Sequence, residues 1–79
     1  MDKQEIKVNP NSVIGTSYSQ LASVTVTDVD VTLEFVYINP RNQLEGAVVS
    51  RVTLPKSVAS DLANTIKLTL ENHDSKTKN

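Results

Sequence analysis

Hydrophobic and polar residues alternate along residues 18–54, with the two-residue period that is typical of half-buried β-strands. The alternation is clearest at residues 29–38, because one set of side chains there is entirely apolar and the other is largely polar. The apolar set is Val29, Val31, Leu33 and Phe35, and the polar set is Asp30, Thr32 and Glu34. Residues 18–26 and 44–54 follow similar patterns, so the sequence predicts three strands.

The predicted second and third strands are separated by residues 39–42, which include Pro40 between two asparagines. Proline lacks a backbone donor and asparagine favours turns, so this segment is typical of a hairpin loop. If the loop spans the four residues 40–43, odd positions of the second strand lie opposite even positions of the third strand. This register places Val31 and Phe35 on the same face as Val52 and Val48.

This register also places Arg51 on the outer face of the sheet, directly opposite Thr32. Asp30 and Glu34 are then its diagonal neighbours, within reach of an arginine side chain. Two interpretations follow. The group is either a solvated cross-strand charge cluster, which contributes little to stability, or a point at which Arg51 and Glu34 recognise an anionic or polar partner.

The period changes to about 3.6 residues after Leu54, which predicts an amphipathic helix. Pro55 suits its opening, because the first N–H groups of a helix have no acceptor within the helix. The apolar positions recur every fourth residue at Val58, Leu62, Ile66 and Leu70, with Ala59 and Ala63 beside them. We therefore expect a small α+β domain, in which one C-terminal helix covers one face of an antiparallel sheet.

The two ends of the chain are more polar. Residues 1–16 carry a short alternation at Ile6 and Val8, and we interpret them as a flexible arm or a fourth, edge strand. Residues 17–72 form the predicted single domain, and residues 73–79 form a polar tail.

The composition and charge of the chain exclude several classes of function. The 79 residues contain no cysteine, which removes thiol catalysis and Cys-ligated zinc and is compatible with a cytoplasmic location. No apolar run is long enough to span a membrane, and we do not expect the polar first residues to act as a signal peptide. The net charge of −1, with scattered basic residues, argues against a general nucleic-acid binder. No Gly-rich phosphate loop or nucleophile motif is present, so the sequence predicts no catalytic residues, cofactor or metal site.

Three segments together resemble a known family. They are residues 18–22 (Tyr-Ser-Gln-Leu-Ala), residues 30–35 (Asp-Val-Thr-Leu-Glu-Phe) and residues 50–54 (Ser-Arg-Val-Thr-Leu), the last leading into the helix. They are similar to a widespread family of short bacterial and archaeal proteins without an assigned biochemical function. The resemblance covers roughly residues 18–72 and implies an architecture rather than an activity. Gln20 stands where the family usually has Asn, and Pro55-Lys56 replaces a Ser-Pro pair.

The expected function is therefore that of a non-catalytic, self-associating interaction module, with a two-fold symmetric dimer favoured. Association would use the sheet edges or the outer sheet face. The residues expected to form the interaction surface are Tyr18, Gln20, Asp30, Glu34 and Arg51.

Two other groups of residues have alternative interpretations. Asp28 and Asp30 point the same way and could hold a hard cation, but alternation on a solvated strand explains them without a metal ion, and we favour that interpretation. The alternative function is a nucleic-acid-binding oligomer that aligns lysines of several subunits, namely Lys56, Lys67, Lys76 and Lys78.

Overall fold

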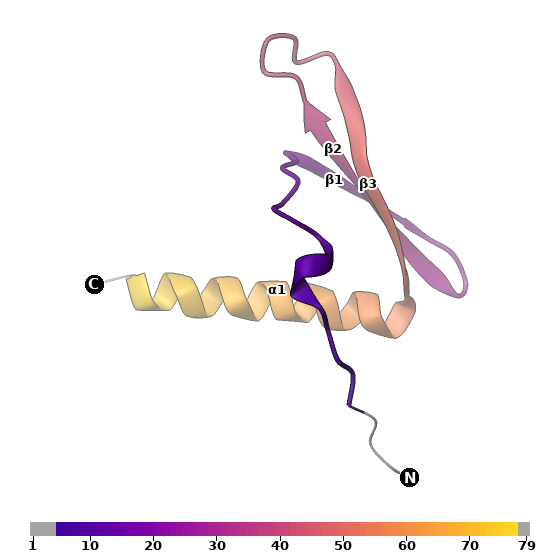
Figure 1. The fold of residues 1–79 in the computed structure, drawn as a ribbon, viewed down its shortest axis with the longest axis vertical. Coiled ribbons are helices and arrows are strands. Elements are labelled where there is room, and N and C mark those ends of the chain that lie inside the picture. The colour runs from indigo at the N-terminus through magenta and orange to yellow at the C-terminus, as the bar shows by residue number, and fades with distance from the viewer. Residues whose placement is uncertain (1–4, 78–79) are drawn as a thin grey trace.

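A computed structural model describes residues 5–77 of the chain. Three antiparallel strands, β1 (Leu21–Val26), β2 (Asp30–Ile38) and β3 (Gly46–Pro55), form one sheet in the order β1-β2-β3. A long helix, α1 (Lys56–Thr77), follows β3 (Figure 1). This confirms the predicted α+β class, with an antiparallel sheet and a C-terminal helix.

A turn built around Thr27 connects β1 to β2. The Thr27 hydroxyl accepts hydrogen bonds from the backbone N–H groups of Val29 (3.2 Å) and Asp30 (3.1 Å). It donates to the Asp30 carboxylate at 2.7 Å, and the Thr27 N–H donates to the Asp30 carbonyl at 2.9 Å. The side chain thus supplies the turn with the acceptor that a backbone carbonyl would otherwise provide.

The register between β2 and β3 differs from the prediction. Odd positions pair with even ones over residues 30–35 of β2 but not over residues 36–38, and Glu34 lies directly opposite Arg51, with Thr32 opposite Thr53. The prediction that Thr32 faces Arg51 is therefore wrong by two residues. One cause is the loop, which is longer than the predicted residues 40–43: the Asn39 N–H donates to the Glu45 carbonyl across it.

The second cause is a β-bulge. Phe35 pairs with Ser50 but Val36 pairs with Val48, so Val49 is an extra residue on β3. An extra residue interrupts the alternation of side chains on the bulged strand. Val48 consequently lies across from Val36 on the outer face, and the prediction that it shares a face with Phe35 is wrong.

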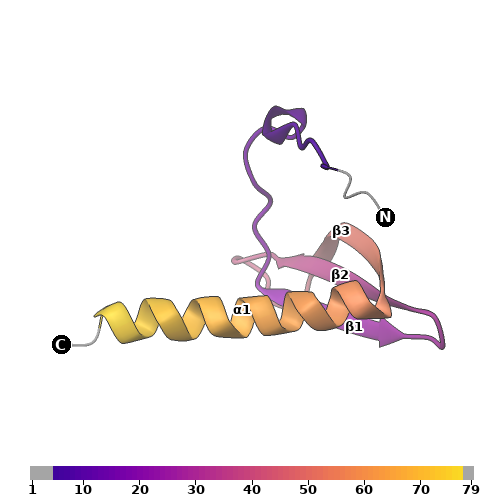
Figure 2. The same ribbon diagram turned by 90° about the horizontal axis from the view of Figure 1, so that it is seen from below.

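Helix α1 begins at Lys56, immediately after Pro55 ends β3, with no loop between them. It continues beyond Leu70 to Thr77, so residues 73–77 of the predicted tail are helical. The helix approaches β3 and β2 but makes no comparable contact with β1. Figures 1 and 2 show the helix running away from the sheet, with its C-terminal end in open space.

The arm that precedes the sheet adds no strand over its described residues 5–20. It contains one 3₁₀-turn, η1 (Pro10–Ser12), whose first turn is capped by the Asn9 side chain accepting from the Asn11 N–H at 3.0 Å. Residues 1–4 lie outside the described part. The radius of gyration of the chain is 16.4 Å, whereas a compact chain of this length has about 12 Å. The fold is thus unusually open.

The Thr27→Val substitution tests the turn. It removes the hydroxyl that two backbone donors share, so we expect the free energy of unfolding to fall by about 1 kcal/mol. Urea denaturation at one fixed protein concentration measures the change. Thr25→Val is the matched control, because Thr25 lies on β1 opposite Thr32 and its hydroxyl makes no comparable bonds. Equal effects of the two substitutions would contradict this role of Thr27.

Candidate functional site

The main surface feature is an open apolar groove between α1 and the sheet face that looks toward it, here called the inner face. Its volume is about 580 Å³. The sheet supplies one wall, formed by Ala22, Val24, Val26, Val31, Leu33 and Phe35. The helix supplies the other wall, formed by Ala59, Leu62, Ala63 and Ile66, with Lys56 and Ser60 completing the lining.

The groove explains why this chain has almost no core of its own. Among the described residues, only Val31 is buried, with 9% of its surface exposed. Val24 and Val26 on β1 are 59% and 61% exposed, and Ile66 on the facing helix is 51% exposed. Exposed apolar surface costs about 25 cal/mol per Å² relative to burial, so a contiguous patch of this kind indicates a binding surface.

The outer face of the sheet is more polar and carries the predicted charge pair. The Arg51 Nε donates to the Glu34 Oε2 at 2.7 Å, from directly opposite positions on β3 and β2. The Arg51 side chain is exposed and that of Glu34 is partly covered. Beside this pair, the hydroxyls of Thr32 and Thr53 lie 2.9 Å apart. The arrangement matches a cross-strand ion pair on a solvated face.

Gln20 lies at the end of β1 and extends the sheet with its side chain. Its Oε1 accepts from the Ile38 N–H at 2.8 Å, and its Nε2 donates to the Ile38 carbonyl at 3.2 Å. The amide therefore imitates a further residue of the strand. Tyr18, two residues earlier, is exposed.

The structure brings together only part of the predicted interaction surface. Glu34 and Arg51 touch each other in the middle of the sheet. Asp30 is the first residue of β2 and lies beside the C-terminal end of β1, whereas Tyr18 and Gln20 precede the other end of β1. A six-residue strand separates these ends by about 20 Å, so the five residues lie at three separate places rather than in one site.

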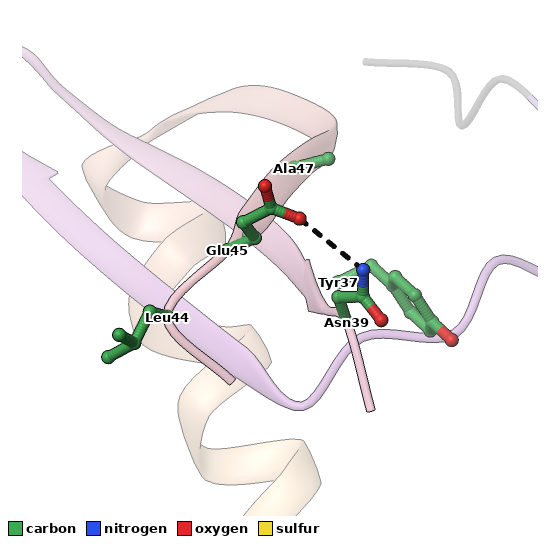
Figure 3. A pocket seen from close by; sticks show the side chains of 6 residues that line it. Tyr37, Asn39, Leu44, Glu45 and Ala47 are labelled. Atoms are coloured by element: carbon green, nitrogen blue, oxygen red, sulfur yellow. Dashed lines mark hydrogen bonds between the residues drawn. The ribbon is translucent and has the colours of Figure 1, made fainter. Parts of the chain in front are cut away.

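A second hollow, of about 550 Å³, lies at the tip of the β2–β3 hairpin (Figure 3). The Asn39 Nδ2 donates to the Glu45 Oε1 at 3.4 Å across its mouth, and the Leu44 side chain points away from Tyr37. The Asn42 and Asn39 side chains also hold the loop, by accepting from the Leu44 and Arg41 N–H groups. These bonds account for the polar residues here as loop structure.

The remaining candidate chemistry is dispersed. Within residues 5–77, no group of three or more His, Asp or Glu side chains is placed to hold a metal ion. No helix in this range is long and apolar enough to cross a membrane. Lys56 lines the groove, Lys67 and Lys76 lie further along α1, and Lys78 lies outside the described residues.

Comparison with known proteins identifies a family but no activity. A family model described as a protein of unknown function (DUF3467) matches residues 1–78. The chain belongs to this family. No curated protein and no solved structure matches the chain. The DUF3467 match confirms the resemblance to an uncharacterised family, and it covers the arm and the helix as well as the sheet.

The sequence predicted the apolar faces that line the groove but not the groove itself. We expected the helix to cover one sheet face, whereas it leaves β1 uncovered. One signal was present: β1 offers Ala22, Val24 and Val26 to the inner face, in addition to the apolar residues of β2 and β3. A helix is about 10 Å wide and strands are about 4.8 Å apart, so one helix covers roughly two strands.

The outer-face ion pair yields a quantitative prediction. A double-mutant cycle of Glu34→Gln and Arg51→Ala should give a coupling free energy of about 0.2–1 kcal/mol, because the pair is exposed to water. Urea denaturation at low and high salt measures it, with the smaller value expected at high salt. Coupling well above this range would show that the pair does more than join two strands.

Proposed function

We propose that this DUF3467 protein is a non-catalytic interaction module that works by self-association, with a homodimer as the favoured state. The observation that carries the proposal is the open apolar groove, which leaves the inner sheet face and the facing helix wall exposed together. A chain this small gains little stability from its own core, and association is a common source of additional burial.

The accessible surface supports the same conclusion. The chain exposes 7488 Å², whereas a compact monomer of 8.6 kDa exposes about 4,700 Å². The excess is larger than the roughly 800 Å² per partner that a standard protein–protein interface buries. Part of this excess belongs to the exposed arm, and the groove supplies its contiguous apolar part. The area available is therefore sufficient for a stable dimer.

The lining of the groove supports a non-catalytic role. Lys56 is the only titratable side chain among its lining residues and Ser60 carries the only hydroxyl, so that lining contains no carboxylate or histidine. Catalytic pockets combine an apolar enclosure with several convergent polar or titratable groups. A wall of Val, Leu, Ile, Phe and Ala suits the burial of another apolar surface.

The mass of the protein in solution is the first test. Sedimentation over a concentration series, at two salt concentrations, should give a dimer or a larger assembly whose stability rises or stays level with salt, because apolar burial drives it. A monomer at all concentrations would overturn the proposal. An assembly that dissociates steeply with salt would assign the contact to charged groups instead of the groove.

A pair of lysine substitutions then tests which surface is used. Val24→Lys places a charge on the inner face, and we expect it to weaken self-association by at least about tenfold, because the charge would have to be desolvated. Thr25→Lys, the next residue on the same strand, places the charge on the outer face and should leave association unchanged. Val24 is 59% exposed in the single chain, so a protein that stays monomeric would tolerate both substitutions equally.

A further inference from the structure

Helix α1 carries a continuous apolar stripe that its own sheet covers only in part. At about 100° per residue, its positions occupy an arc of about 140° on the helix surface. The members of the stripe are Val58, Ala59, Leu62, Ala63, Ile66 and Leu70. Ile66 and Leu70 are 51% and 58% exposed, and the helix extends beyond the sheet in both ribbon views (Figures 1 and 2).

We infer that the groove of one chain is filled by α1 of a second copy. In this arrangement the two helices pack stripe against stripe, antiparallel, around a two-fold axis near Ala63. The inference rests on the proposed self-association and specifies the surface and the geometry that it uses. Each helix then completes the groove of the other chain, so that one interface closes both grooves.

The shape of the groove favours a helix as its occupant. One wall of the groove is α1 and the other is the inner sheet face, including β1, which α1 does not contact. The vacant place is therefore an apolar slot between a helix and an uncovered strand. Ala59 and Ala63 lie one turn apart on the helix wall, and small side chains let two helices approach to about 8 Å. The stripe of a second α1 presents the larger Leu62 and Ile66 side chains to this slot.

The polar side of the helix limits how the two copies can be arranged. Asp61, Asn64 and Glu71 lie away from the stripe, so burying that side would desolvate charges. An arc of about 140° is wide enough to contact a sheet below and a second helix beside it. We therefore place both helices in one layer, with their polar sides facing water.

The arm is a weaker candidate for the same place. Its exposed apolar residues Ile6, Val8, Val13 and Ile14 are interrupted by the 3₁₀-turn at Pro10–Ser12. They therefore do not form a continuous ridge of the kind that fills a groove between a helix and a sheet. An arm from the same or a neighbouring chain is nevertheless a distinct outcome of the experiment.

Cysteine cross-linking tests the arrangement directly, because the chain contains no cysteine of its own. Single variants Ala63→Cys, Asn64→Cys and Leu70→Cys would be oxidised in dilute solution, and the disulfide-linked dimer measured on a non-reducing gel. A disulfide needs Cα atoms about 4.4–6.8 Å apart, which only residues near the two-fold axis of an antiparallel pair achieve. Each variant is first shown, while reduced, to keep the circular dichroism spectrum and mass of the parent.

We expect Ala63→Cys to cross-link at least about tenfold faster than the other two variants. Asn64 is adjacent but lies on the polar side, and Leu70 is in the stripe but lies about 20 Å from its symmetry copy when the helices are antiparallel. Equal cross-linking at Ala63 and Leu70 would overturn the antiparallel geometry, since parallel helices bring every stripe residue beside its copy.

Two further variants identify the competing contacts. Thr25→Cys reports pairing of β1 edges, which are open in the described structure, and Ile14→Cys combined with Ala63→Cys reports an arm in the groove. The helix pairing would be overturned if the dimer cross-links in the Thr25→Cys variant or in the Ile14→Cys/Ala63→Cys double variant but not in the single Ala63→Cys variant. The proposed self-association would still stand. A monomeric parent protein would overturn both.

Discussion

The rest of the structure depends on one constraint: a single helix is too narrow to cover the apolar inner face of a three-stranded sheet. Three strands present apolar side chains to one side, and the single helix lies near two of them, β3 and β2. Since burial of apolar surface is the main favourable term in folding, a chain that buries only Val31 among its described residues lacks most of that term. The direct junction between Pro55 and Lys56 contributes to this exposure of the inner face. With no loop between them, the helix leaves the end of β3 at an angle and the groove stays open.

Several polar side chains of the molecule make their bonds within the sheet. Thr27 closes one hairpin, Gln20 prolongs one strand and Glu34 pairs with Arg51 across two strands. Each of these side chains satisfies backbone groups or a charge within its own sheet. Glu34 and Arg51 thus pair on the outer face and Gln20 and Thr27 bond backbone groups near the two ends of β1, whereas the apolar inner face stays open within one chain. This contrast directs attention from the polar residues to the groove.

Periodicity predicted which side chains lie on each face of a strand or helix. It did not predict strand register or the groove, because these depend on how the elements are placed in three dimensions. The alternation of Val31, Leu33 and Phe35 correctly assigned the inner face of β2. The predicted partner of Arg51 was wrong because alternation does not reveal the bulge at Val49 or the longer loop. The groove was missed for a related reason: a stripe shows that a helix face is apolar, but it does not show which surface covers that face.

The connections in this fold are short, since Thr27–Asp30 joins β1 to β2 and no residue separates β3 from α1. Chains dominated by such local contacts close their loops at little entropic cost and form their elements quickly. If the groove is closed by a second chain, the late step of folding is a bimolecular collision rather than a rearrangement within one molecule. The lifetime of the unfinished chain would then depend on how many copies the cell makes at once, so that synthesis rate becomes part of the folding pathway.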